Sequence, residues 1–284
     1  MSNKPLISAQ DLQFALEAGG VIVVDCRYDF ADAAKGRRDW LEGHLPGARY
    51  AHLDDDLAAP VSSDSGRHPL PDPTEFAGWL SSIGWTPDHL LVAYDQGNAM
   101  FAARLWWMMR YYGFASKVLD GGLAAWNDLG YVIESGDVTV TPSEPVRLEG
   151  RESMTVDVSA VMANLENSSF TMIDARAPER YSGEVEPLDT AAGHIPGALN
   201  RVFAANLDGQ GKFRPAEELA QQFNSLLGDV PAQDVVHSCG SGVTACHNLL
   251  AMEVAGLGGS RVYTGSWSEW IRDPARPTSR GSQP

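Results

Sequence analysis

The amino-acid sequence predicts an α/β fold with two tandem domains, each a mainly parallel sheet flanked by helices. Three observations carry this prediction. A series of four sequence blocks occurs twice in the same order, which indicates an internal duplication. Short β-branched runs alternate with longer segments of helical periodicity, a pattern typical of βα units on a parallel sheet. The chain has 284 residues, which is enough for two domains that each bury a core.

The duplication is visible as matched blocks of sequence. In the first half they read VIVVDCRYDF (21–30), GHLPGARYAHLD (43–54), HLLVAYDQGNAMFAARLWWMM (89–109) and VLDGGLAAW (118–126). In the second half they read FTMIDARAPERY (170–181), GHIPGALNRVFAANL (193–207), DVVHSCGSGVTACHNLLAM (234–252) and VYTGSWSEW (262–270). The polar stretch between the halves contains Pro and Gly and lacks helical period. We therefore predict an N-terminal domain over 1–136, a linker over 137–153 and a C-terminal domain over 154–284.

The elements of each half follow from the spacing of apolar residues. Short β-branched or apolar runs predict strands, which fall at 21–24, 91–94, 172–173 and 234–237. Longer segments with apolar residues at helical spacing predict helices, which fall at 73–83, 99–112, 216–227 and 243–255. In sheets of this kind, ligands bind beyond the carboxyl ends of the strands. Cys239 follows the strand at 234–237 and therefore lies at such an end.

The sequence around Cys239 has the layout of a reactive cysteine. A β-branched strand leads into the thiol, a Gly-Ser-Gly turn follows, and a helix opens near Val243 and Thr244. Gly240 and Gly242 lack a Cβ, so the backbone can curl with its N–H groups directed at the sulfur. The positive end of the helix adds to the same effect, and both favour the nucleophilic thiolate. The alternative is that Cys239 is a buried small hydrophobic residue, as most free cysteines are.

Composition and charge exclude several classes of function. Hydrophobic residues make up 44% of the chain and charged residues 20%, which is typical of a globular protein. A net charge of −16 argues against nucleic acid or an anionic membrane as partner, although a local basic pocket for a small anion remains possible. The N-terminal sequence lacks an apolar leader, and no run of about 18 apolar residues occurs. The three cysteines do not form a disulfide framework, so we expect a cytoplasmic protein.

These motifs together resemble the tandem-domain rhodanese-family sulfurtransferases. The loop CGSGVTA (239–245) is similar to that of the 3-mercaptopyruvate sulfurtransferases. Further motifs belong to the same pattern, namely GHLPGA, GHIPGA, DAR (174–176), RYSG (180–183), DGG (120–122) and GSWSEW (265–270). The resemblance covers nearly the whole chain. Two copies of the Gly-His motif at matching offsets make it specific.

The resemblance implies a double-displacement reaction. Cys239 would attack the sulfur of a small anionic donor, hold it as a persulfide and pass it to a thiol, a thioredoxin-like protein or cyanide. Neither a metal nor an organic cofactor is implied. Backbone N–H groups of the loop, which runs through Gly240, Gly242, Val243 and Thr244, would stabilise the thiolate and the persulfide.

The residues after the cysteine favour 3-mercaptopyruvate as the donor. In relatives that prefer thiosulfate these two positions tend to be basic, whereas here they are Gly240 and Ser241. The resemblance pairs Ser241 with a histidine and an aspartate, for which His68 in GRHPLP and Asp54 in AHLD are the candidates. Such a relay is chemically sensible because pyruvate leaves as an enolate that must be protonated.

Arginines are the candidate ligands of the donor carboxylate. Arg180 matches the principal anion-binding arginine of the family, and a guanidinium suits a carboxylate. Arg176 is better explained as a structural partner of an acidic residue, although it also belongs to the candidate substrate site. Relatives that use mercaptopyruvate carry a second arginine where this chain has Leu188 and Asp189. Arg201, just past GHIPGALN, is a hypothetical substitute for that second arginine.

Alternative functions remain open at the level of sequence. The same alignment places Asp95 opposite Cys239, so we expect one active site, in the second half, with a non-catalytic first half. A cysteine phosphatase would need an arginine six residues after the nucleophile, where this chain has Ala245. A thiosulfate:cyanide sulfurtransferase with the same persulfide mechanism, or a sulfur-relay or binding module without turnover, are the remaining alternatives.

Overall fold

The computed structural model describes residues 4–284, which divide into two compact units. The first unit comprises the chain up to Ala59, then Leu70–Arg151 and Gly209–Phe213. The second unit comprises Pro60–Pro69, Glu152–Asp208 and Arg214–Pro284. The short segment Pro60–Pro69 therefore groups with the second unit, although it lies in the first half of the sequence.

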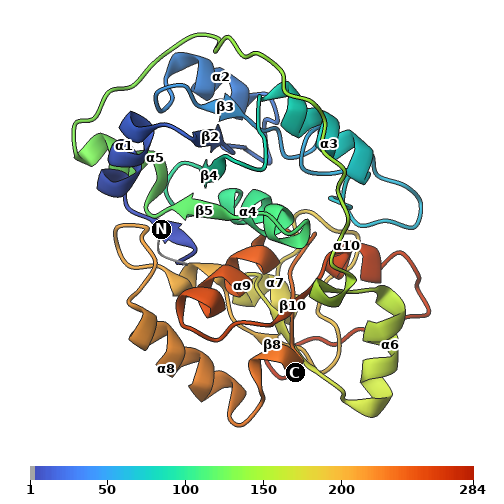
Figure 1. The fold of residues 1–284 in the computed structure, drawn as a ribbon. Coiled ribbons are helices and arrows are strands. Elements are labelled where there is room, and N and C mark those ends of the chain that lie inside the picture. Colours follow the sequence, from blue (N-terminus) through green and yellow to red (C-terminus); the bar gives the residue numbers. More distant parts are fainter. Residues whose placement is uncertain (1–3) are drawn as a thin grey trace. The chain divides into compact units, whose positions relative to one another are not determined.

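The first unit is built on a parallel five-stranded sheet with the order β1-β5-β4-β2-β3. Its strands are β1 (Leu6–Ile7), β2 (Val21–Asp25), β3 (Arg49–Tyr50), β4 (Leu90–Tyr94) and β5 (Ser116–Leu119). Its helices are α1 (Ala9–Ala18), α2 (Lys35–Glu42), α3 (Pro73–Ser82), α4 (Ala102–Tyr111) and α5 (Gly122–Asp128). Figure 1 shows α1 and α5 next to each other on one side of these strands and α3 on the other.

The second unit repeats this topology, with the strand order β6-β10-β9-β7-β8 and all pairs parallel. Its strands are β6 (Thr155–Val156), β7 (Thr171–Asp174), β8 (Leu199–Asn200), β9 (Val235–Ser238) and β10 (Arg261–Tyr263). Its helices are α6 (Val158–Asn167), α7 (Pro178–Ser182), α8 (Ala216–Leu227), α9 (Thr244–Val254) and α10 (Ser266–Trp270), with 3-10 turns η1 (Glu152–Met154), η2 (Phe203–Asn206) and η3 (Ala232–Asp234). The predicted fold class is confirmed.

Local sequence explains where several helices begin. Ser8 accepts a hydrogen bond from the backbone N–H of Asp11 and caps α1, and Asp157 caps α6 in the same way through Ala160. The helix predicted over 99–112 begins only at Ala102. Ala99 has a φ of 57°, a left-handed conformation that cannot belong to a right-handed helix.

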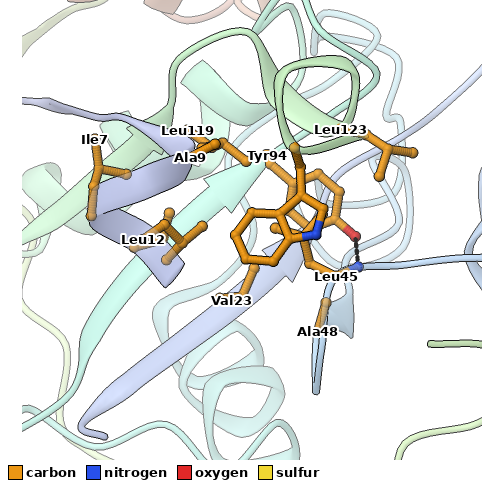
Figure 2. Packing of buried hydrophobic residues seen from close by; sticks show 11 residues of the cluster. Ile7, Ala9, Leu12, Val23, Leu45, Ala48, Tyr94, Leu119 and Leu123 are labelled. Carbon is orange, nitrogen blue, oxygen red and sulfur yellow. Dashed lines mark hydrogen bonds between the residues drawn. The ribbon is translucent and has the colours of Figure 1, made fainter. Parts of the chain in front are cut away.

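Apolar side chains of the first sheet and its helices form a continuous core, shown in Figure 2. Leu12 of α1 and Val23 of β2 are nearly inaccessible to solvent. Tyr94 lies in the same cluster, and its hydroxyl accepts a hydrogen bond of 3.2 Å from the backbone N–H of Leu45. An equivalent cluster in the second unit includes Val236 of β9 and Trp267 of α10. Each sheet is therefore fixed by its own core, and the strand ends are rigid platforms for loops.

Of the segment 137–153, which we predict as a linker, residues up to Arg151 group with the first unit and residues from Glu152 group with the second. The backbone N–H of Ser143 donates to the Ser81 carbonyl over 3.0 Å, and its hydroxyl donates to the Trp85 carbonyl over 2.6 Å. Extended chain can thus pack on a unit through hydrogen bonds without forming helix or strand. Over the described residues, no helix has both the length and the apolar character needed to cross a membrane.

Candidate active site

The thiol of Cys239 lies at the carboxyl end of β9, directly after Ser238. The backbone N–H groups of Ser241 and Gly242 point at its Sγ atom, at 3.4 and 3.1 Å. Helix α9 begins at Thr244, after Val243, so its positive end follows the same loop. N–H groups held in this orientation stabilise negative charge on sulfur, whether thiolate or persulfide.

Gly242 makes this loop possible. Its φ is 80°, in the left-handed region that favours glycine. A Cβ at this position would lie 2.3 Å from the carbonyl oxygen of Thr264, so the two backbones could not approach as they do. The close packing of the loop against the chain after β10 therefore requires glycine.

The start of α10 holds the other side of the loop. The hydroxyl of Ser266 accepts from the backbone N–H of Cys239 over 3.1 Å and donates to the carbonyl of Tyr263 over 2.9 Å. The N–H groups of Trp267 and Ser268 donate to the carbonyls of Cys239 and Gly240, at 3.0 and 2.9 Å. These bonds give partners to backbone groups of Cys239 and Gly240, which lie beyond the end of β9, and they hold the loop in place.

His68 and Ser241 meet within the second unit. The Nδ1 atom of His68 lies 2.7 Å from the Oγ atom of Ser241, and both side chains are buried. Asp54 belongs to the first unit, where its carboxylate accepts a 2.5 Å hydrogen bond from the hydroxyl of Tyr28. The pair of His68 with Ser241 is thus a geometric observation, and the place of Asp54 in a relay stays a prediction.

Arg180 of α7 has acidic partners that hold its guanidinium. Its Nη2 atom lies 2.7 Å from Oε1 of Glu186 and 3.3 Å from Oδ2 of Asp189. A Cβ built on Gly240 would lie 3.5 Å from the same Nη2 atom. Arg180 therefore reaches the residue next to the thiol, and its role as a ligand of an anionic donor stays a prediction.

Arg176 and Arg201 have different surroundings. Arg176 is buried, and its guanidinium bonds Asp174 at 2.7 Å and the carbonyl of Gly193 at 2.8 Å. Burial opposes the charge of Arg176, but its ion pair with Asp174 outweighs that effect and raises its pKa above the ordinary value. Arg201 bonds the amide oxygens of Asn206 and Gln222 at 2.9 Å. These contacts are those of structural arginines, and a substrate role for either stays a prediction.

Arg67 is a site residue that sequence reasoning missed. Its Nη2 atom lies 2.9 Å from the position that a Cβ of Gly240 would take. Its Nη1 atom forms an ion pair with Asp189, which also pairs with Arg180. Its position in the sequence could have indicated this. Arg67 directly precedes His68, so a segment that places His68 at the cysteine loop also places Arg67 near it.

The arrangement can perform nucleophilic sulfur chemistry. Cys239 supplies a nucleophile in a cradle of N–H groups, Ser241 and His68 supply a hydroxyl and an imidazole in contact, and guanidiniums lie over Gly240. Ala245 is buried in α9, so the position that would hold a phosphatase arginine carries a methyl group.

Comparisons with known proteins agree with this chemistry. The family model for the rhodanese-like domain matches residues 8–129 and 157–273, once in each half. A probable 3-mercaptopyruvate sulfurtransferase from Pseudomonas aeruginosa is 44% identical over 99% of this chain and 100% of that protein. The thiosulfate sulfurtransferase of chicken (Gallus gallus) is 31% identical over 94% of this chain and 93% of its own length.

Solved structures show the same similarity in three dimensions. The crystal structure of a 3-mercaptopyruvate sulfotransferase from Escherichia coli superposes with a TM-score of 0.81 and 30% identity, covering 93% of this chain and 99% of that chain. The 3-mercaptopyruvate sulfurtransferase of Leishmania major gives a TM-score of 0.83 at 28% identity, covering 96% of this chain and 76% of that chain.

Proposed function

The chain belongs to the rhodanese-like sulfurtransferases, and from this premise we propose that it transfers a sulfane sulfur from 3-mercaptopyruvate, through a persulfide on Cys239, to an acceptor. A thiol, a thioredoxin-like protein or cyanide is the acceptor of this proposal. The observation that carries it is the contact of Ser241 with His68 beside an otherwise neutral loop. A proton-transfer pair there is needed for a keto-acid donor and not for thiosulfate.

The first half-reaction balances as follows. The Cys239 thiolate attacks the sulfur of 3-mercaptopyruvate, an S–S bond forms, and the C–S bond of the donor breaks. Its electron pair remains on the organic fragment as the enolate of pyruvate, and the enzyme keeps the sulfur as a persulfide. A proton must then reach the methylene carbon of the enolate to give pyruvate.

We assign that proton to the hydroxyl of Ser241, which His68 reprotonates over the 2.7 Å contact. Asp54 is the proposed third member, whose carboxylate would orient the imidazole and stabilise its charge. Arg180 is the proposed ligand of the donor carboxylate because its guanidinium lies over Gly240. The N–H groups of Ser241 and Gly242 stabilise the persulfide as an oxyanion hole stabilises oxygen.

The experiment that tests the proposal compares two donors. The purified protein is given 3-mercaptopyruvate or thiosulfate, with cyanide as acceptor, and thiocyanate formation is followed. A clear preference for 3-mercaptopyruvate supports the proposal, and a preference for thiosulfate contradicts it in favour of the alternative donor. Single-turnover mixing without acceptor must load one sulfur atom on the Cys239 peptide by mass spectrometry, and Cys239→Ser must load none. Loading without turnover would indicate a sulfur-relay protein.

We also propose a reducing, cytoplasmic location. Cys26, Cys239 and Cys246 form no disulfide in the part of the chain that the structure describes, and a persulfide enzyme needs its thiol reduced. Burial, followed by the neighbouring charges of Asp25 and Asp95, raises the pKa of the Cys26 thiol well above its ordinary value. The Cys26 thiol therefore ionises less readily to the thiolate that persulfide chemistry needs.

A further inference from the structure

The segment that contains His68 lies against the cysteine loop in matched order. His68 contacts Ser241, and Arg67, the residue before it, faces Gly240, the residue before Ser241. Ser268 fixes this register from both sides. Its hydroxyl accepts the backbone N–H of Arg67 over 2.9 Å, and its own N–H donates to the carbonyl of Gly240 over 2.9 Å. The backbone of Arg67 is therefore held against the cysteine loop next to His68.

Arg67 and Arg180 converge on the same point beside the thiol. The position of a Cβ on Gly240 lies 2.9 Å from Nη2 of Arg67 and 3.5 and 3.7 Å from Nη2 and Nη1 of Arg180. A Cβ at 240 would displace the Arg67 guanidinium and would contact that of Arg180 at ordinary van der Waals distance. The glycine thus leaves room for paired cations directly next to the nucleophile.

Asp189 forms ion pairs with both Arg67 and Arg180. One carboxylate oxygen pairs with Nη1 of Arg67 and the other lies 3.3 Å from Nη2 of Arg180. The Asp189 side chain is 4% exposed, whereas those of Arg67 and Arg180 are 26% and 20% exposed. The Asp189 side chain is covered and the two arginine side chains are partly exposed, as a pair that presents positive charge to an incoming anion must be.

We propose that Arg67 is the second cation of the donor site and that it binds the carboxylate of 3-mercaptopyruvate together with Arg180, with Asp189 holding both in place. The inference rests on the proposed function and extends it to substrate recognition. It also accounts for Leu188, whose aliphatic side chain cannot bind an anion. Arg67, which directly precedes His68, supplies the positive charge that is absent at position 188.

Steady-state kinetics of Arg67→Met test the proposal, because methionine keeps much of the side-chain length and removes the charge. Loss of a charge-assisted hydrogen bond should raise the KM for 3-mercaptopyruvate by about 10- to 100-fold. Inhibition by pyruvate should weaken by a similar factor, while kcat changes by less than about threefold because the proton-transfer pair is intact. Arg214→Met is the control, since Arg214 pairs with Glu218 on α8.

Further variants separate recognition from folding. Arg67→Lys keeps the ion pair with Asp189 but loses the planar fork, so its KM should lie between those of wild type and Arg67→Met. Leu188→Arg, placed in the Arg67→Met background, returns a guanidinium next to Asp189 and should recover at least about tenfold in KM. A structural role for Arg67 would not be rescued in this way.

The outcomes distinguish the two proposals. If wild type uses 3-mercaptopyruvate and Arg67→Met has the same KM, the role of Arg67 is refuted and the proposed function stands. A fall in kcat alone would also refute it and make Arg67 a positioning residue for His68. If wild type fails to use 3-mercaptopyruvate although Cys239 loads sulfur from thiosulfate, both proposals fall.

Discussion

His68 and Ser241 are 173 residues apart in the sequence, yet His68 Nδ1 lies 2.7 Å from Ser241 Oγ. Both residues belong to the second unit, because Pro60–Pro69 packs there. Their side chains are 5% and 4% exposed, so bulk water does not compete for the hydrogen bond. A buried hydroxyl and imidazole in contact form a unit that can pass a proton to a bound intermediate.

Removal of either partner should slow the keto-acid donor selectively. We expect His68→Ala and Ser241→Ala to lower kcat with 3-mercaptopyruvate by about 100- to 10,000-fold, the range of general acid catalysis. Thiosulfate turnover should fall far less, because its leaving group needs no proton on carbon. The double variant should be little worse than either single one if the residues act together.

The control is His89→Ala, which removes a histidine that bonds Thr86 in the first unit. It should leave both donor activities unchanged. Equal losses with both donors in His68→Ala would instead make His68 a structural residue of the Pro60–Pro69 segment.

Gly242 should tolerate no side chain. In Gly242→Ala the new Cβ would meet the Thr264 carbonyl at 2.3 Å, so the loop must move and the N–H groups of Ser241 and Gly242 must turn away from the thiol. We expect a fall of at least about 100-fold in sulfur loading of Cys239, comparable with the loss of an oxyanion-hole donor. Rapid-quench mass spectrometry of the persulfide measures this rate.

Gly256→Ala is the matched control. Gly256 also has a left-handed φ, 77°, but a Cβ there would meet nothing within 4 Å. Both variants carry the backbone strain of alanine at positive φ, about 1 kcal/mol, and only Gly242→Ala adds the collision. Similar loading rates in the two variants would show that the loop does not depend on the close approach to Thr264.

The sequence predicts the parts of this fold that carry a local signal. Strands β2, β4, β7 and β9 and helices α3, α4, α8 and α9 are confirmed, with ends within three residues of those expected. Strands of two residues, such as β3 (Arg49–Tyr50) and β8 (Leu199–Asn200), were not predicted. A period of two cannot be recognised in two residues, so only pairing with the neighbouring strand defines them.

In the candidate site, too, features that are local in sequence can be predicted and contacts between distant residues cannot. The sequence predicts the layout of the loop around Cys239 because strand, thiol, turn and helix are contiguous in it. The ion pair of Arg67 with Asp189 joins residues 122 positions apart, and no local pattern records such a contact. From sequence, Leu188 and Asp189 indicate only a missing arginine, whereas in the structure Asp189 forms ion pairs with Arg67 and Arg180.

Asp95 shows why the first unit is expected to be a scaffold. Its carboxylate follows β4 as Cys239 follows β9, and it accepts backbone hydrogen bonds of 2.9 to 3.2 Å. The donors are the N–H groups of Gly97, Ala99, Phe101 and Ala102. Burial raises the pKa of Asp95, and these N–H groups oppose that shift.

We therefore expect Asp95→Ala to lower the stability of the first unit by about 3 kcal/mol, because it leaves buried N–H groups without an acceptor. Sulfur loading of Cys239 per folded chain should stay close to wild type. Urea unfolding and persulfide mass spectrometry on the same samples measure the two effects. Asp88→Ala is the control, since Asp88 is exposed in the same unit. Loss of loading in a folded Asp95→Ala protein would contradict the scaffold role.

His237 makes the stability of the second unit depend on pH. It lies in β9, two positions before Cys239, and is fully buried. Its Nε2 atom is 3.1 Å from Ser260 Oγ, and within the described part of the chain Nδ1 has no hydrogen-bond partner. Protonation would place a charge in the core and leave a second N–H unpaired, so burial lowers the pKa of His237 to about 3.

The sign of the effect follows from this lowered pKa. Between the ordinary pKa of 6.5 and about 3, the unfolded chain binds a proton at His237 and the folded chain does not. The stability of the second unit is therefore complete above pH 6.5 and falls as the pH decreases, by up to about 1.4 kcal/mol per pH unit from this residue. His237→Gln, which cannot titrate, should have a shallower slope between pH 6.5 and 4.5 in urea unfolding. Ser260→Ala should be less stable at every pH but keep the wild-type slope, because His237 remains buried. A wild-type slope in His237→Gln would show that other groups govern acid unfolding of this unit.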